Sequence, residues 1–123
     1  RLNQAKKEFS KGEKQKAIDL LKLVIDRHSD SSNEFNPLVT AAKTRLCRIY
    51  ISQKDYQEVL NTLSNSDVLT ASLLELKGDA ENQLGLYELA RVSYMRALQN
   101  SPSQTSRTLI NMKISNLEGE KIE

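Results

Sequence analysis

Cysteine and histidine, two residue types common in catalytic sites, are scarce in this sequence. The chain contains a single cysteine, Cys47, and a single histidine, His28. A cysteine nucleophile needs a base beside it, and His28 is the sole histidine that could serve. The alternative is a small, buried and unreactive cysteine. Because one histidine cannot complete a serine triad or a histidine metal site, we predict no catalytic residue, no cofactor and no metal.

Three carboxylates lie close together in the sequence at Glu75, Asp79 and Glu81. On a helix, Glu75 and Asp79 share one face because they are four residues apart. Paired carboxylates can act as general acid and base, but two acids on a solvated helix face more often serve solubility. No glycine-rich phosphate loop follows a strand. The sequence therefore favours a binding protein over an enzyme.

Composition limits the fold class. The 123 residues suffice for one domain, and they include only 4 glycines and 2 prolines, which favours long helices over strands and turns. The net charge of +2 gives no nucleic-acid signature. No apolar run approaches the roughly 20 residues that would span a membrane. A lone cysteine excludes an internal disulfide and leaves the redox compartment open.

The helices that position these side chains are clearest in residues 74–102. Their small, aromatic and proline residues follow spacings of 7, 5, 4, 3 and 5, at Gly78, Gly85, Ala90, Tyr94, Ala97 and Pro102. This pattern resembles the tetratricopeptide repeat, a helix hairpin of about 34 residues. Gly78 would allow a close helix crossing, Gly85 would end the first helix, and Ala90 would let the second approach.

Hydrophobic periodicity predicts further helices along the chain, with Gly12 ending the first and Asn36-Pro37 starting the third. The predicted helices are 2–11, 14–28, 37–53, 56–63, 68–84, 86–100 and 103–118. We therefore expect an all-α, tetratricopeptide-repeat-like right-handed superhelix of about three helix hairpins plus a C-terminal capping helix. Residues 1–119 would form this single domain, and 120–123 a frayed tail.

Apolar stripes on these helices predict the core. The stripe residues are Ala17, Leu20, Leu21, Val24 and Ile25, then Val39, Ala42, Leu46, Ile49 and Tyr50, then Val59, Leu60 and Leu63, and finally Leu109, Ile110, Ile114 and Leu117. Cys47 takes the crossing position that Gly78 holds in the next hairpin. The small residues of the second helices, Ala17, Val59 and Ala90, are 42 and 31 residues apart, so the array is irregular.

The concave face of such an array is lined by the first helix of each hairpin. The repeat period places there Lys6, Phe9, Thr44, Arg48, Ser52, Glu75, Asp79 and Asn82, with Ser10, Ile51, Ser72 and Gln83 beside them. For each residue, an ordinary solvent-facing position is the alternative. The face would be basic in the first hairpins and acidic in the third, which suits a peptide or partner helix of mixed charge. Glu75 and Asp79 would repel an acidic C-terminal tail.

Residues 46–119 carry a closer resemblance. Arg45-Leu46 with Arg48 is similar to an "LRLAR" run, residues 76–80 (LKGDA) to "LRGEA", and residues 112–117 (MKISNL) to "MKINNL". These runs resemble the C-terminal portion of the YfgM family, an ancillary subunit of the bacterial SecYEG translocon. Residues 1–40 fit more loosely, through KGEKQKAIDLL.

The resemblance implies a periplasmic repeat domain on a longer chain held in the inner membrane by an upstream transmembrane helix. Its implied partners are the SecYEG translocon and a membrane-anchored prolyl-isomerase-like chaperone, and its implied role is to assist exported proteins. The family supplies no catalytic or binding residues to transfer. The alternative is a cytosolic adaptor or secretion chaperone of the same fold. An enzyme would require a shared pocket holding Cys47 and His28.

Overall fold

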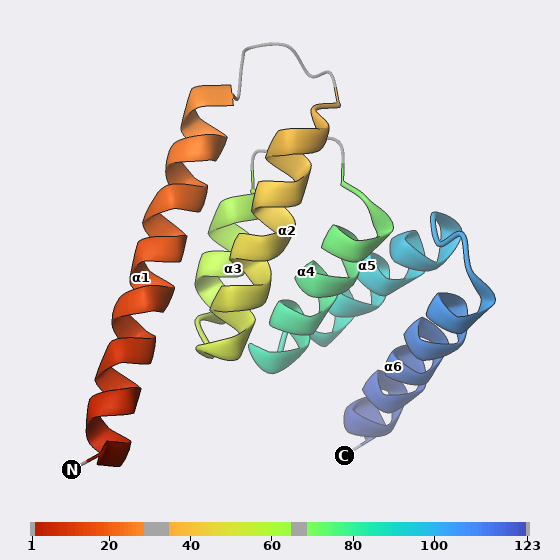
Figure 1. Ribbon diagram of the computed structural model, residues 1–123. Coiled ribbons are helices and arrows are strands. Elements are labelled where there is room, and N and C mark those ends of the chain that lie inside the picture. Colours follow the sequence, from red (N-terminus) through yellow and green to blue (C-terminus); the bar gives the residue numbers. More distant parts are fainter. Residues whose placement is uncertain (1, 29–34, 65–68, 123) are drawn as a thin grey trace.

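The computed structural model describes the backbone of residues 2–28, 35–64 and 69–122, and the side chains of 10–28, 35–64 and 69–117. These residues form six helices, α1 (Leu2–His28), α2 (Pro37–Ser52), α3 (Tyr56–Leu63), α4 (Ala71–Gln83), α5 (Tyr87–Gln99) and α6 (Gln104–Ile122), and no strand. Helices α2, α4 and α6 lie in one layer with α3 and α5 behind them, and α1 runs along the α2 edge (Figure 1). The predicted all-α class is confirmed.

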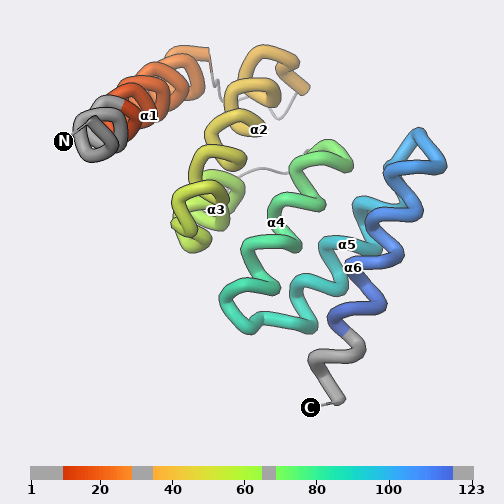
Figure 2. The backbone as a smooth tube through the Cα atoms, turned by 60° about the horizontal axis from the view of Figure 1, so that its bottom comes forward, coloured from red at the N-terminus to blue at the C-terminus, as the bar shows by residue number. Residues whose placement is uncertain are grey.

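The helices succeed one another across the array, from α1 at one edge to α6 at the other (Figure 2). The pairs α2–α3 and α4–α5 are helix hairpins, each closed by a short turn. One buried cluster lies between α1, α2, α3 and α4 around Leu46 and Val59, and a second lies between α4, α5 and α6 around Tyr94 and Ile110. Each hairpin therefore buries its apolar face against a neighbour, as stacking requires.

Helix α1 corrects the prediction that Gly12 ends a helix. The chain is helical from Leu2 to His28, so the predicted first hairpin is one continuous helix, and the described residues form two hairpins rather than three. A glycine inside a helix destabilises it by only about 1 kcal/mol relative to alanine. The lysine, glutamate and glutamine residues around Gly12 favour a helix, and the penalty of about 1 kcal/mol for one glycine is too small to end the helix there. His28 is the last residue of α1, which matches the predicted helix end at 28; residues 29–34, between this helix and the next predicted one, lie outside the described residues.

The buried stripe of α1 is also narrower than predicted. Ile18, absent from the predicted stripe, is only 3% exposed, whereas Leu20 is 63% exposed. Leu21 and Ile25 are partly buried against the core. Because α1 is an edge helix that packs mainly on α2, only one narrow side of it is covered.

Helix α2 begins as predicted. The Asn36 side-chain oxygen accepts hydrogen bonds from the backbone N–H groups of Leu38 at 3.0 Å and Val39 at 3.3 Å, and Pro37 occupies the first turn. This arrangement satisfies amide groups that have no partner inside the helix. The predicted apolar side of the helix is confirmed, since its members are buried or half-buried, namely Val39, Ala42, Leu46, Ile49 and Tyr50.

The α4–α5 hairpin has the predicted turn and a shifted start. Helix α4 begins at Ala71 rather than at residue 68, and its N-cap is Thr70, whose hydroxyl oxygen accepts the Leu73 N–H at 3.2 Å. Of the predicted cap segment 64–67, residues 65–67 lie outside the described residues. Gly85 has φ of +80°, the left-handed conformation predicted for the helix end.

Gly78 of α4 lies against the Tyr94 ring of α5. A Cβ atom added there would lie 2.6 Å from Cε1 of the Tyr94 ring. Ala90, Tyr94 and Ala97 are at most 1% exposed, which confirms the predicted stripe of α5. The glycine therefore makes room for the aromatic ring of Tyr94.

Helix α6 is longer than predicted. It continues to Ile122, beyond the expected end at 118, so residues 120–122 of the predicted frayed tail are helical. Ile110 and Leu117 are buried and Ile114 is partly buried, as predicted. Leu109, placed on the same stripe, is 51% exposed because one side of this last helix packs on α5 and the other has no neighbour among the described residues.

Candidate functional site

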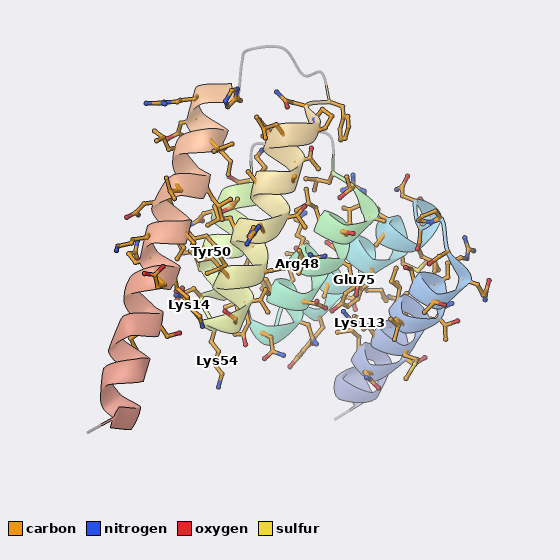
Figure 3. All side chains as sticks on the ribbon, viewed as in Figure 1. Lys14, Arg48, Tyr50, Lys54, Glu75 and Lys113 are labelled. Atoms are coloured by element: carbon orange, nitrogen blue, oxygen red, sulfur yellow. The ribbon has the colours of Figure 1, made fainter. Side chains whose placement is uncertain are left out.

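The layer of α2, α4 and α6 brings together the predicted binding residues of two hairpins. Figure 3 shows Arg48 of α2, Glu75 of α4 and Lys113 of α6 on the same side of the molecule. Helical spacing places Thr44 and Ser52 on the Arg48 side of α2, one turn to either side of it. Two of these side chains, Arg48 and Ser52, are exposed, and Thr44 is half-buried.

The hydroxyl groups of this layer are engaged locally. Thr44 Oγ1 donates to the Thr40 carbonyl at 2.8 Å, and Ser52 Oγ donates to the Ile49 carbonyl at 2.6 Å. Arg48 differs, since it makes no ion pair with any described residue. Helix α2 contains no acidic residue at all. Arg48, like the exposed Arg45 one turn before it, is therefore a charged group of α2 that is available to a partner.

The predicted residues of the first hairpin are placed differently. Lys6 and Phe9 lie in the N-terminal part of α1, and their side chains are outside the described residues. Ser10 is exposed. Because α1 is a single helix rather than a hairpin, the repeat geometry that assigned Lys6 and Phe9 to the concave face does not apply to them, and their role stays a prediction.

Glu75 and Asp79 are not on a freely solvated face, contrary to the prediction. Lys113 Nζ lies 2.5 Å from Glu75 Oε2, and 3.0 and 3.1 Å from the two carboxylate oxygens of Asp79. The Tyr94 hydroxyl donates to Asp79 Oδ1 at 2.5 Å. The two acidic side chains are only 28% and 27% exposed. Together Glu75, Asp79, Tyr94 and Lys113 form a polar cluster that ties α6 to the α4–α5 hairpin.

The charge states of this polar cluster follow from its surroundings. Burial alone lowers the pKa of Lys113, but its hydrogen bonds to Glu75 and Asp79 outweigh that effect and raise the pKa above its ordinary value. Burial, together with the bond to Asp79, raises the pKa of Tyr94 well above its ordinary value. At neutral pH the ammonium group is charged and the phenol keeps its proton, so both can donate to the carboxylates.

Lys113 is the residue of this cluster that the sequence reasoning did not assign to the site. A signal was available, because Lys113 lies between Ile110 and Leu117 at the i+3 and i+7 spacing of a buried stripe. A lysine on a half-buried stripe needs a carboxylate partner. The two carboxylates that bind it, Asp79 and Glu75, lie 34 and 38 residues away in the sequence, so only the fold identifies them.

The other predicted acidic and amide residues of α4 have separate positions. Glu81 is 3% exposed and accepts a hydrogen bond from Ser93 Oγ at 2.6 Å, so it joins α4 to α5 inside the hairpin. Asn82 is half-buried and lies seven residues after Glu75, on the same side of α4. Asn82 therefore remains a candidate binding residue, whereas Glu81 belongs to the core.

Cys47 and His28 do not form a nucleophile–base pair. Cys47 is completely buried in the first core cluster, whose members include no histidine, and burial raises the pKa of its thiol to about 12. His28 is exposed at the end of α1. A thiol that keeps its proton at neutral pH and has no access to solvent is a poor nucleophile, so Cys47 is the small hydrophobic residue that the alternative described.

The residues with described structure contain no group of three or more histidine, cysteine, aspartate or glutamate side chains arranged to hold a metal ion. None of their helices combines the length and apolar character needed to cross a membrane.

The stacked hairpins and the polar inter-helix cluster define a repeat-type interaction module. A sequence profile of the tetratricopeptide repeat-like domain matches residues 1–119, and the chain belongs to this family. Comparison with curated proteins and with solved structures gives no significant match. The repeat interpretation from 74–102 is thus confirmed for nearly the whole chain, and such domains are generally protein-interaction modules rather than enzymes.

Proposed function

We propose that this domain binds a segment of a partner protein on the layer formed by α2, α4 and α6, with Arg48 as its main charged contact. The observation that carries the proposal is that Arg48 is exposed and without an ion pair, while the acidic pair next in the layer is already bound by Lys113. An arginine binds carboxylates through a planar fork of donors. The partner segment would therefore place a carboxylate against Arg48.

This proposal changes the charge expected of the partner. A face of free basic and free acidic residues would select a segment of mixed charge. Lys113 neutralises one of the two negative charges of Glu75 and Asp79, and α2 contains basic but no acidic residues, so the α2 part of this layer around Arg48 is basic. A carboxylate-bearing segment is thus favoured over the mixed-charge segment that the sequence alone predicted.

The particular setting we propose is the periplasmic face of the inner membrane. There the domain would associate with the Sec translocon and a membrane-anchored prolyl-isomerase-like chaperone and assist exported proteins. The support is the resemblance of residues 46–119 to the YfgM family. Within its MKISNL run, Lys113 has a structural role in holding α6, which gives a physical reason for a lysine at that position in a domain of this shape.

Site-specific photocrosslinking in the full-length protein tests both parts of the proposal. A photoreactive amino acid replaces Arg48 in one variant and Arg96 in a matched control, since Arg96 is an exposed arginine on α5 in the other layer. We expect position 48, and not 96, to capture translocon or chaperone subunits in intact cells.

The outcomes separate the face from the partner. Capture from position 96 alone would overturn the assignment of the face. Capture of cytosolic proteins from position 48, with the domain protected from protease added outside the inner membrane, would retain the face and replace the periplasmic setting by the cytosolic adaptor.

A further inference from the structure

The turn of the α2–α3 hairpin contains a lysine where the other hairpin contains a glycine. Lys54 has φ of 63° and Gly85 has φ of 80°, so both residues adopt the left-handed conformation. The hydrogen bonds of the turns match, with Asp55 N–H donating to the Tyr50 carbonyl and Leu86 N–H donating to the Glu81 carbonyl, each at 2.8 Å. Glycine adopts this conformation freely, whereas a Cβ atom meets the following carbonyl.

Any side chain at position 54 therefore disfavours the left-handed backbone conformation that this turn adopts. A positive charge there interacts favourably with the carbonyl end of α2, yet the α4–α5 turn does without one. Lys54 is exposed and forms no ion pair with a described residue. Residues in such uncommon conformations often serve a role outside packing.

Two lysines of α1 supply charge of the same kind on the side of the helix that faces the array. Lys14 and Lys11 precede Ile18 by four and seven residues, so they continue the buried stripe of Ile18 and Ile25 toward the N-terminus. Residues 10–16 are all exposed, and neither lysine has an ion-pair partner among the described residues. In Figure 3, Lys14 lies on the hairpin side of α1, and Lys54 extends from the turn at the lower end of that hairpin.

Among the described acidic side chains near these lysines in sequence, Glu13 lies 4.0 Å from Lys16 on α1. Asp19 and Glu58 interact electrostatically with Lys22, which is not part of this group of lysines. Asp55 is exposed beside Lys54 and offsets one charge. A basic surface of Lys11, Lys14 and Lys54, which we name the basic edge, therefore keeps uncompensated positive charge.

We propose that the basic edge binds an acidic segment of a partner protein, independently of the face around Arg48. The charge complementarity selects a ligand rich in carboxylates, and three flexible ammonium groups suit a chain with several of them. A flat anionic membrane would instead meet the outward side of α1. There Lys16, two residues from Ile18 and so on the opposite side, already lies beside Glu13.

The test measures binding of a fluorescein-labelled oligoglutamate peptide by anisotropy at low salt, with an oligoglutamine peptide as the uncharged reference. The variant is Lys11→Gln/Lys14→Gln/Lys54→Gln. Lys16→Gln and Arg96→Gln serve as control variants, because both remove exposed positive charge elsewhere. Circular-dichroism melts verify that every variant is folded.

We expect the triple variant to weaken oligoglutamate binding roughly ten-fold, since three exposed charge pairs each contribute a few tenths to one kcal/mol. Each control should change it less than about two-fold, and Lys54→Arg should retain binding. The proposal is overturned if Lys16→Gln weakens binding as much as Lys14→Gln, because net charge alone would then explain it. It is also overturned if phosphatidylglycerol vesicles bind through these lysines while the peptide does not.

Discussion

The two hairpins α2–α3 and α4–α5 are built on one plan with different side chains. Their turn residues Lys54 and Gly85, and their second-helix starts Tyr56 and Tyr87, are each 31 residues apart. The same offset pairs Cys47 with Gly78 and Leu63 with Tyr94. At the helix crossing, the first hairpin has the small Cys47 and a leucine, Leu63. The second has Gly78, which lacks a side chain, and the large Tyr94.

The difference shows how a crossing keeps its volume while its chemistry changes. Removing the side chain at Gly78 makes space for the Tyr94 ring, which lies against it. The ring also brings a hydroxyl group that reaches Asp79 and, through it, Lys113 of the next helix. Leu63 in the first hairpin fills space but cannot donate a hydrogen bond. The second hairpin is therefore equipped to hold α6 through polar contacts.

The largest expected effect comes from replacing Gly78 of the second hairpin by cysteine, the residue that the first hairpin has at the equivalent position 47. Gly78→Cys places a side chain against the Tyr94 ring and should lower the free energy of unfolding by about 2–3 kcal/mol. Adding Tyr94→Leu recreates the pair Cys47 and Leu63. The double variant should lose at least about 1 kcal/mol less than the sum of the single variants in urea unfolding. Strict additivity would show that the two positions do not compensate each other.

A second effect tests the close approach of α4 and α5 at Ala90. Ala90 is completely buried where the first hairpin has Val59. Ala90→Leu should reduce stability by about 1–3 kcal/mol through overpacking. The neighbouring Leu89 is 54% exposed, so Leu89→Ala is a control that should change stability by less than about 0.5 kcal/mol. An unchanged melt of Ala90→Leu by circular dichroism would contradict the placement of this crossing.

The two hairpins have different titratable groups at their crossings, a thiol in the first and a phenol in the second, so they should differ at alkaline pH. The Cys47 thiol has an ordinary pKa of 9.0 and a folded-state pKa of about 12 because of burial. Its contribution to stability is complete below pH 9 and is lost as the pH rises toward 12, since the unfolded thiol loses its proton first. By pH 10 the loss should reach about 1.4 kcal/mol.

Urea unfolding at several pH values between about 8 and 10 measures this slope. In Cys47→Ala the slope should be smaller, even though the smaller side chain lowers stability at every pH. Equal slopes in the two proteins would mean that the Cys47 thiol is not shielded as the structure shows. The Lys113 and Tyr94 contributions have the same sign but become large only above their ordinary pKa values of 10.5 and 10.0, so the Cys47 thiol dominates the slope in the lower part of this window.

The smallest expected effect concerns the two turns. Lys54→Gly should stabilise the protein by about 0.5–1 kcal/mol, because glycine relieves the left-handed backbone even though it increases the entropy of the unfolded chain. Gly85→Lys should destabilise it by a similar amount. Thermal melts of both variants measure these two changes in stability. A destabilised Lys54→Gly would show that the lysine contributes more to the turn than its backbone conformation removes.

Features determined by neighbouring residues were predictable from the sequence. The Asn36-Pro37 start, the left-handed Gly85 and the stripe of Ala90, Tyr94 and Ala97 depend on local backbone chemistry and helical period, and the structure confirms each. A need for space at Gly78 was also predicted, and in the structure the Tyr94 ring occupies that space. The repeat pattern was therefore enough to define the fold class.

The misplaced features depend on contacts between elements distant in the sequence. Whether Leu20 is buried depends on how many helices cover α1, and the solvation of Glu75 and Asp79 depends on Lys113. Gly12 was overweighted as a helix end because a single residue's preference is small beside that of its flanks. The binding role of the face around Arg48 stays a prediction, and its free charge could be assessed only once the ion pairs were known.

The continuity of α1 has a consequence for how the domain opens locally. Residues 10–16 are exposed on all sides, whereas Ile18, Leu21 and Ile25 are packed against the core. The helix is continuous, but we expect residues 10–16 to open at a lower free-energy cost than the packed part from Ile18 onward. Gly12 lies in the part that opens more easily. Amide protons of residues 11–16 should exchange with solvent through local fraying, while those around Ile18 should exchange only when the α1–α2 contact separates. A partner bound to Lys11 and Lys14 would slow the first process and leave the second unchanged.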